Sequence, residues 1–350
     1  MNNATPQVGR RVLVTGAAGQ DGAYLCRDLL GQGYEVHTAL PADSALESPW
    51  RWRELAIADH PALHVHRLDL RDAERCRVFL SALEPEQIFH LAAISSVAEG
   101  HAAPLRVFEA NALVCVNLLD ALRRLGNGAS FIYAASSEMY SNGPVDEASR
   151  PLARHPYALS KLAGHAAVGC FRDSFGLRAS SAILFNHESP LRGAAFVTRK
   201  LAAAAARPDA EPIALGNLDA HRDFGYAPEY VQALQMMALR ATAQDFVLAT
   251  GVLTSIREFA TRIYAAAGMD LEWRGQGSAE TAHDAADGRL KLRIDSALWR
   301  PSDDAMICGD ARLARTQLGF APVTDVTTLA RLMLDAERRR VAELPSSSPI

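Results

Sequence analysis

Short apolar runs alternate with longer amphipathic segments along the first half of the chain. Each run is mainly aliphatic and ends at turn-forming residues, which is typical of buried parallel strands. The runs cover residues 11–15, 34–40, 62–69, 87–91 and 130–134. Between them, apolar residues recur at helical spacing over residues 23–33, 72–82 and 104–125. This alternation predicts an α/β fold with a doubly wound parallel sheet.

The pattern changes after about residue 184. Loops rich in Asn, His, Pro, Gly and Arg there separate short helical patterns at residues 196–206 and 255–267. We therefore expect residues 1–183 to form the sheet domain and residues 184–340 to form a smaller α/β C-terminal lobe. Some strands and helices of the second segment are expected to cross back to the first domain. Residues 341–350 are predicted to be a disordered tail.

Composition narrows the class of protein. Of the 350 residues, 49% are hydrophobic and 22% are charged, as in a globular protein. The net charge of -4 means that the protein has no overall positive charge with which to attract polyanions. Nucleic acid is therefore not an expected partner. The five cysteines are dispersed without metal-ligand spacing, so we expect neither a metal site nor a disulfide framework. Because signal-peptide and membrane-spanning patterns are absent, the interpretation is a cytoplasmic protein without a membrane partner.

A glycine-rich turn connects the first strand to the first helix. Gly16, Gly19 and Gly22 lie in the segment GAAGQDG, in which Gln20 and Asp21 precede the last glycine. Glycines at such a turn let backbone amides approach a pyrophosphate at the helix N-terminus. The GxxGxxG spacing differs from the GxGxxG fingerprint, and an ordinary strand-to-helix turn is the alternative. Together with the strand–helix alternation, the turn predicts a Rossmann-type dinucleotide-binding domain.

Further cofactor contacts are expected where the third and fourth strands end. Asp69 and Leu70 close the third strand, where a carboxylate could reach an adenine ring; a local turn is the alternative. Leu91, Ala92 and Ala93 end the fourth strand. Two of these residues are small and leave room for a dinucleotide, although small residues at strand ends are also ordinary packing.

Tyr157 and Lys161 are one helical turn apart, so both lie on the same helix face. An ammonium near a phenol lowers the pKa of the phenol, and the same lysine can hold a cofactor ribose. Ser136 and Glu138 follow the strand at 130–134, where ligands bind in parallel sheets. Ser136 can donate to a sugar oxygen, and Glu138 can move a proton. The alternative is a surface Tyr/Lys pair beside a capping serine and a solvated glutamate.

These residues and the glycine turn resemble the extended short-chain dehydrogenase/reductases. The stretches ILFNHESPLRGAAFVTRK at 183–200, GNLDAHRDFG at 216–225 and CGDARLARTQLGF at 308–320 resemble GDP-mannose 4,6-dehydratases. The resemblance covers nearly the whole chain. It implies conversion of a GDP-hexose to its GDP-4-keto-6-deoxy derivative by hydride transfer from C4 to C6 with loss of water. Tyr157 would take the C4 hydroxyl proton. Glu138 would abstract the C5 proton and protonate the departing C6 hydroxyl.

The same resemblance implies a set of substrate contacts and a cofactor. The substrate residues would be Ser95, Asn186, Glu188, Lys200, Arg222 and Arg300. Each cation could instead be a surface charge or an intramolecular ion pair. The implied cofactor is NADP, but the loop after the second strand has no arginine before Arg51, so NAD is also possible. We expect a homodimer, with a tetramer as the alternative.

Departures from the family pattern keep other functions open. Ile94 and Leu191 stand where the family usually carries glutamine and arginine, so the hexose could differ. The alternatives are a reductase or epimerase of a GDP-4-keto-sugar, a dehydratase for another GDP-sugar such as GDP-heptose, and a non-catalytic nucleotide-binding subunit.

Overall fold

The large sheet of the protein has seven strands, all parallel. The computed structural model describes residues 9–41, 49–141, 143–207, 209–299 and 306–343. The strands are β1 (Arg11–Thr15), β2 (Glu35–Leu40), β3 (Leu63–Arg67), β4 (Gln87–His90), β5 (Ser130–Ser136), β6 (Arg178–Leu184) and β11 (Phe246–Leu248). Their order is β11-β6-β5-β4-β1-β2-β3. This order reverses direction between β1 and β4, as in Rossmann-type folds, so the predicted fold class is confirmed.

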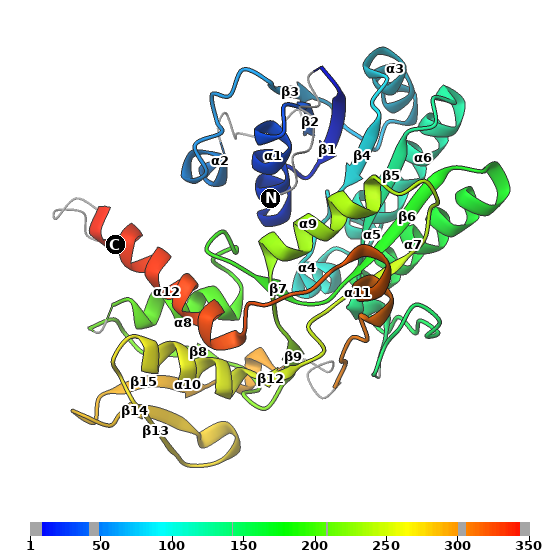
Figure 1. The fold of residues 1–350 in the computed structure, drawn as a ribbon. Helices are drawn as coiled ribbons and strands as arrows, with labels where there is room; N and C mark the ends of the chain where they lie inside the picture. Colours follow the sequence, from blue (N-terminus) through cyan, green and yellow to red (C-terminus); the bar gives the residue numbers. More distant parts are fainter. Residues whose placement is uncertain (1–8, 42–48, 142, 208, 300–305, 344–350) are drawn as a thin grey trace.

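Helices cover both faces of this sheet (Figure 1). They include α1 (Gln20–Gly31), α2 (Trp50–Glu54), α3 (Ala73–Leu83), α4 (Val97–Ala102), α5 (Pro104–Phe108), α6 (Val114–Leu125), α7 (Pro156–Phe175), α9 (Ala227–Ala238) and α11 (Arg312–Leu318). Glycines with positive φ, Gly126 and Gly176, end α6 and α7 as left-handed caps. The helix predicted at 104–125 contains one π-helical turn, η1 (Glu109–Leu113), between α5 and α6.

A second, four-stranded sheet supports the C-terminal lobe. It contains β8 (Ile213–Leu215), β13 (Leu271–Arg274), β14 (Thr281–Asp284) and β15 (Leu290–Ile294), in the order β13-β14-β15-β8. Helices α8 (Val197–Ala205), α10 (Ile256–Ala266) and α12 (Val326–Glu343) pack with this sheet around a separate apolar core. Phe259, Leu292 and Leu329 are completely buried in that core.

The chain returns from the lobe to the large sheet. Strand β11 pairs with β6, and α9 packs beside α1. Val231 of α9 and Phe246 of β11 are buried in the core of the sheet domain, although both follow residue 184. At the C-terminal end, α12 continues to Glu343, so the predicted disordered tail is wrong for residues 341–343. Residues 344–350 lie outside the described residues.

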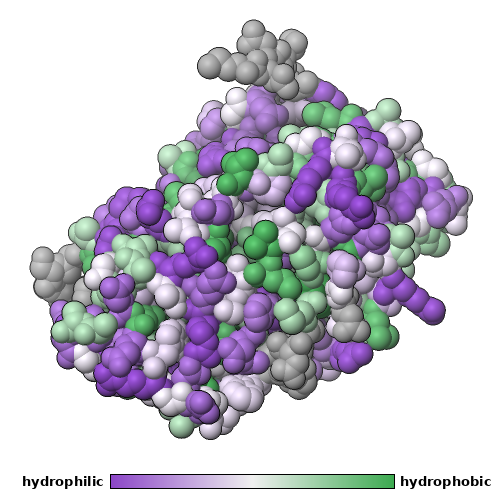
Figure 2. Space-filling model, turned by 60° about the horizontal axis from the view of Figure 1, so that its bottom comes forward, coloured by the Kyte–Doolittle hydropathy of each residue, from purple (hydrophilic) through white to green (hydrophobic). Residues whose placement is uncertain are grey.

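The surface is mixed in character. Figure 2 shows a face on which hydrophilic side chains predominate and apolar ones form small groups between them. Among the described residues, no helix combines the length and apolar character needed to cross a membrane.

Candidate active site

The glycine turn after β1 packs directly against the end of β4. Gly16 has a φ of 75°, and a Cβ added there would lie 2.6 Å from the Ala92 backbone nitrogen. A Cβ on Gly22 would lie 2.3 Å from the Gly16 carbonyl oxygen, which accepts a 2.9 Å hydrogen bond from the Gly19 amide. Side chains are therefore excluded at two of the three glycines. The turn is a bare backbone cradle at the N-terminus of α1, which fits the pyrophosphate of a dinucleotide.

Helix α2 holds this turn from outside. Trp52 donates from Nε1 to the Ala17 carbonyl at 2.8 Å, and Arg51 donates from Nη1 to the Ala18 carbonyl at 3.0 Å. Arg51 also donates from Nε to the Leu191 carbonyl at 2.7 Å. Burial, followed by the charge of neighbouring arginines, lowers the pKa of Arg51 to about 10. Sequence reasoning treated Arg51 only as the end of a loop and missed that it brings a cation to the glycine turn.

Gln20 and Asp21 connect α1 to the lobe. Gln20 accepts from Ser189 Oγ at 2.8 Å and donates to the His187 carbonyl at 3.0 Å. Asp21 Oδ2 lies 2.9 Å from Nε2 of His187, in the short strand β7 (His187–Glu188). Although burial raises the pKa of Asp21, the charge and hydrogen bond of His187 hold it below its ordinary value. These contacts give His187 a structural role and join the two parts of the protein beside the glycine turn.

The predicted catalytic side chains meet at the carboxyl end of β5. Ser136 ends this strand, and its Oγ accepts from the Glu138 amide at 3.2 Å. Glu138 lies in the short 3-10 helix η2 (Ser137–Met139), and Tyr157 lies in the first turn of α7. A side-chain hydrogen bond joins Ser136 to Tyr157, whose side chain is buried. The structure therefore brings Ser136, Glu138 and Tyr157 together from three local elements.

Burial is the largest influence on the Tyr157 phenol. It raises the pKa of Tyr157 to about 12, with Glu138 acting in the same direction, while Ser136 and Arg192 act to lower it. The groups that act most strongly on this phenol do not include Lys161, so the predicted lowering of the phenol pKa by its ammonium stays a prediction. Lys161 is itself buried and donates from Nζ to the Ala134 carbonyl at 2.8 Å. Burial lowers the pKa of Lys161 to about 8, so the amine is mainly charged at neutral pH.

His155 is a site residue that the sequence analysis missed. It caps α7, because its Nδ1 accepts from the Ala158 amide at 3.3 Å. An accepting Nδ1 leaves the ring proton on Nε2. Nε2 lies 3.1 Å from Oε2 of Glu138 and therefore donates to the carboxylate. A histidine before Pro-Tyr indicates a helix cap in the sequence, but nothing there reveals its second contact.

The π-helical turn η1 positions the loop after β4. Its Asn111 accepts from the Ile94 amide at 2.8 Å and donates to the Ile94 carbonyl at 3.1 Å and to Ser160 Oγ at 2.9 Å. One buried amide thereby fixes the loop to α7, and Ser95 is the exposed residue next to the fixed position. π-Helical turns inside α-helices frequently occur at functional sites.

The other predicted cofactor residues lie at the ends of β3 and β4. Asp69 accepts hydrogen bonds from Arg71, which hold the pKa of Asp69 below its ordinary value. These bonds match the alternative of a local turn at Asp69. Leu70 is buried, and its carbonyl accepts from Asn117 at 3.0 Å. Leu91, Ala92 and Ala93 follow β4 at the edge of the glycine cradle, where the Thr15 carbonyl accepts from the Leu91 amide and Thr15 Oγ1 accepts from the Ala92 amide.

The predicted substrate residues come from several segments of the lobe. Asn186 precedes β7, Lys200 is exposed on α8, and Arg222 lies in β9 (His221–Asp223). Glu188 is buried, pairs with Arg192 at 3.0 Å and accepts from Thr198, so it anchors its own loop. Arg300 lies outside the described residues.

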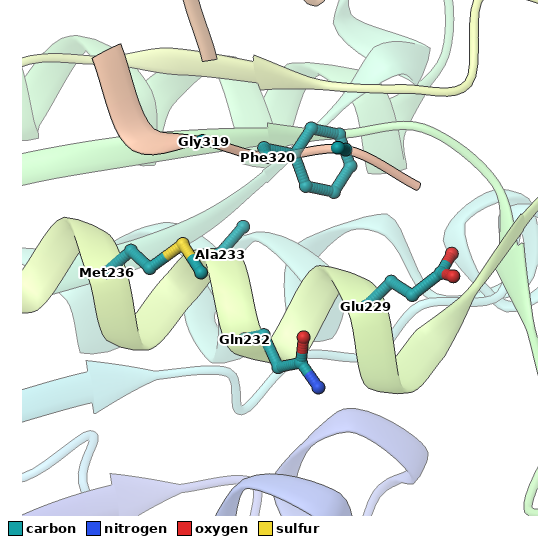
Figure 3. A pocket seen from close by; sticks show the side chains of 7 residues that line it. Glu229, Gln232, Ala233, Met236, Gly319 and Phe320 are labelled. Atoms are coloured by element: carbon teal, nitrogen blue, oxygen red, sulfur yellow. The ribbon is translucent and has the colours of Figure 1, made fainter. Parts of the chain in front are cut away.

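A small pocket lies elsewhere, between α9 and Gly319–Ala321. Glu229, Gln232 and Met236 of α9 line it on one side, and Phe320 lies on the other side (Figure 3). None of the predicted site residues lines this pocket. It is therefore separate from the catalytic group.

Comparisons with known proteins agree with this geometry. The family model described as GDP-mannose 4,6 dehydratase matches residues 13–333. A GDP-mannose 4,6-dehydratase of Sinorhizobium fredii is 38% identical over 329 residues, covering 91% of this chain and 93% of the relative. The GDP-mannose 4,6 dehydratase of Homo sapiens is 33% identical, with coverage of 93% and 90%.

Solved structures share the fold. A putative epimerase from Burkholderia cenocepacia superposes with a TM-score of 0.78 and 26% identity, covering 95% of this chain and 99% of that chain. RMD from Pseudomonas aeruginosa, complexed with NADPH, has a TM-score of 0.72, 23% identity and coverage of 95% and 100%. The second likeness concerns the fold alone. On the family match and the curated relatives together, the chain belongs to the GDP-mannose 4,6-dehydratase family.

Proposed function

We propose that this chain dehydrates GDP-mannose to its GDP-4-keto-6-deoxy derivative, with Ser136, Glu138, Tyr157 and Lys161 as the catalytic residues. The observation that carries the proposal is the placement of Glu138 beside the hydrogen-bonded Ser136/Tyr157 pair at the end of β5. Oxidation of a sugar hydroxyl needs the tyrosine and the serine. Removal of water from C5 and C6 also needs an acid/base, and the carboxylate of Glu138 provides it.

Tyr157 and Ser136 act on the C4 hydroxyl in this proposal. A nicotinamide dinucleotide, when bound, accepts a hydride from C4 and returns it to C6. Tyr157 removes the hydroxyl proton, and Ser136 hydrogen-bonds the sugar oxygen beside it. The Ser136 hydrogen bond and the charge of Arg192 favour the phenolate against the effect of burial. Lys161 is held on the Ala134 carbonyl, one helical turn from the phenol, where it can also contact a ribose.

Glu138 acts at C5 and C6. The C4 ketone acidifies the C5 hydrogen, Glu138 removes that proton, and the carboxylic acid then protonates the departing C6 hydroxyl, which leaves as water. When the hydride is returned to C6, C5 takes up one proton, which balances the C4 hydroxyl proton that Tyr157 removed. The hydrogen bond from His155 engages Oε2 and orients the carboxylate. His155 is therefore a positioning residue for Glu138.

The nucleotide would bind in the lobe through the residues that the family resemblance assigns. Lys200, Arg222 and Arg300 would bring positive charge to the diphosphate, and Asn186 would hydrogen-bond the nucleotide. Glu188 would act indirectly, since its carboxylate is engaged by Arg192 and Thr198. Ser95 would face the sugar from the loop that Asn111 fixes.

The cofactor is a nicotinamide dinucleotide, and within this class the proposal is NADP. Arg67 ends β3 beside Leu40, the last residue of β2, where the adenosine ribose lies in Rossmann-type folds. Its guanidinium lies 3.5 Å from the Pro41 carbonyl. This charge favours a 2′-phosphate although the preceding loop lacks arginine. If Arg67→Gln weakens NADP⁺ binding no more than NAD⁺ binding, the preference for NADP has another source.

A homodimer is proposed from one apolar face. Leu105, Phe108, Leu113 and Val116 are exposed along α5, η1 and α6, and Leu159 is exposed on the adjacent α7. Exposed apolar residues that cluster in this way mark protein–protein contacts. Light scattering should give a dimer for the parent chain and a monomer for Leu105→Asp; a monomeric parent contradicts the proposal. A cytoplasmic location would suit the five free cysteines.

The decisive experiment incubates the purified chain with GDP-mannose and follows the mass of the nucleotide sugar. Parallel samples contain NADP⁺, NAD⁺ or no added cofactor. Loss of one water without net cofactor reduction is the expected result, fastest with NADP⁺. An unchanged mass in every sample, with GDP-mannose shown to bind, would contradict the proposed substrate or reaction.

A further inference from the structure

Three histidines and one glutamate lie together on the outer part of the large sheet, away from the catalytic group. Glu35 and His37 lie two residues apart in β2, and His64 and His66 lie two residues apart in β3. Residues two apart in a strand point to the same face. His37 is the direct register neighbour of His64, so all four side chains share one face of the β2–β3 pair.

The ligand atoms of three of these residues converge. One nitrogen of His37, one nitrogen of His64 and a carboxylate oxygen of Glu35 all lie within 4.8 Å of one another. A tetrahedral zinc site has bonds of about 2.0–2.2 Å to nitrogen and oxygen, which puts its ligand atoms somewhat over 3 Å apart. Shifts of about an ångström in the ligand atoms would bring the three to these separations.

His37 is already oriented for such a role. Its Nδ1 is 2.9 Å from Nε2 of His66, so one ring nitrogen is engaged by an imidazole outside the set of three. Metal-ligating histidines usually donate their second ring nitrogen to an outer partner in this way. The other nitrogen, Nε2, is buried and has no hydrogen-bond partner within the part of the chain that the structure describes. A cation bound at Nε2 would satisfy this buried polar atom.

We propose that Glu35, His37 and His64 bind a divalent transition metal, best Zn²⁺, with water as the fourth ligand and His66 as the outer partner of His37. Zinc takes both imidazole and carboxylate ligands, whereas two imidazole nitrogens are poorly suited to Mg²⁺ or Ca²⁺, which prefer oxygen ligands. His64 is exposed, which provides an entry path for the ion. Besides His64 and His66, the positive charge of Arg11 acts on His37, and Arg11 is itself paired with Glu84 at 3.8 Å.

The consequence of this site is a cross-link. Within the described ranges, strand β3 is the edge of the sheet and pairs with β2 alone. A metal held by Glu35 and His37 on one strand and His64 on the other connects the edge strand to the interior. Because the metal binds the folded arrangement, it raises the apparent stability of the protein with concentration. The site goes beyond the proposed dehydratase activity and does not depend on it.

The test uses the full, untagged chain after treatment with a chelator. Titration with Zn²⁺ in a calorimeter should show one ion per chain, and Zn²⁺ but not Mg²⁺ should raise the thermal unfolding midpoint. His64→Gln should weaken Zn²⁺ binding at least tenfold and remove the thermal shift. Because His64 is exposed, this variant should fold, and dehydration of GDP-mannose without added metal should be unchanged.

His283→Gln, which changes a histidine of the other sheet, is the matched control and should bind Zn²⁺ like the parent. Failure of the parent chain to bind Zn²⁺ would overturn the proposal. So would binding that His64→Gln leaves intact, because the ion would then sit elsewhere. Neither result would affect the proposed dehydratase function, which is measured separately in the same preparations.

Discussion

The proposed catalytic group and the proposed nucleotide-binding residues of the lobe are built differently. At the end of β5, Ser136 and Tyr157 are buried and hydrogen-bonded, and Lys161 is fixed to a strand carbonyl. In the lobe, Lys200 is exposed on α8, whereas Arg222 lies in β9, so these two cations are not held by one element. A buried, fully bonded group loses a specific chemical step when one atom is removed, whereas an exposed cation contributes part of a shared attraction. Substitutions should therefore have large effects in the first region and graded effects in the second.

The largest effect is expected for Tyr157→Phe, which removes the proposed base and leaves the ring in place. The kcat for dehydration should fall by about 10²- to 10⁴-fold, the usual contribution of a positioned proton-transfer group. Nucleotide-sugar mass measures turnover, and circular dichroism checks the fold. Tyr264→Phe, at a buried tyrosine of the lobe, is the control and should keep its activity. Parental turnover by Tyr157→Phe would exclude this phenol as the base.

Glu138→Gln should produce the next largest loss, about 10²-fold or more in kcat, because an amide cannot accept the C5 proton. The informative measurement is exchange of the C5 hydrogen with deuterium from heavy water. The parent should incorporate deuterium at C5 during turnover, and the variant should not. Incorporation at the parental rate would show that another group removes this proton.

His155→Asn should have a smaller effect. Asparagine can cap α7 but is too short to repeat the contact with Glu138. A hydrogen bond to a charged group contributes about 1.5–3 kcal/mol, so kcat should fall about tenfold or somewhat more, with KM unchanged. His155→Ala should also lose the cap and should unfold at a lower temperature. If His155→Asn and the parent have the same kcat, His155 serves to cap α7 and does not act through Glu138.

The smallest effect is expected for Lys200→Ala. Loss of one exposed cation near a diphosphate should raise the KM for GDP-mannose about three- to fivefold and leave kcat nearly unchanged. Arg293→Ala, at another exposed cation of the lobe, is the control and should leave KM unchanged. A tenfold fall in kcat for Lys200→Ala would contradict the expected difference between the two regions, because a residue of the lobe would then take part in the chemical step.

The sequence determined the alternation of strands and helices and the local motifs. Strand periodicity, helix periodicity and glycine turns all depend on residues that are close together in the chain. Strand β1 has the predicted bounds, and Gly16 and Gly22 pack as the turn requires. The spacing of Tyr157 and Lys161 likewise predicted a shared helix face. The positions of the predicted strands required no knowledge of distant contacts. Their order in the sheet is in agreement with the predicted fold class.

The tertiary structure decided which distant groups meet and how burial changes them. His155 reaches Glu138 only when α7 docks at the end of β5, and burial outweighs nearby charge in setting the pKa of Tyr157. Sequence spacing predicted no metal site. The proposed set at Glu35, His37 and His64 depends on the parallel register of β2 with β3, which brings residues 37 and 64 side by side. Such contacts follow from packing between elements, and periodicity along the chain does not specify them.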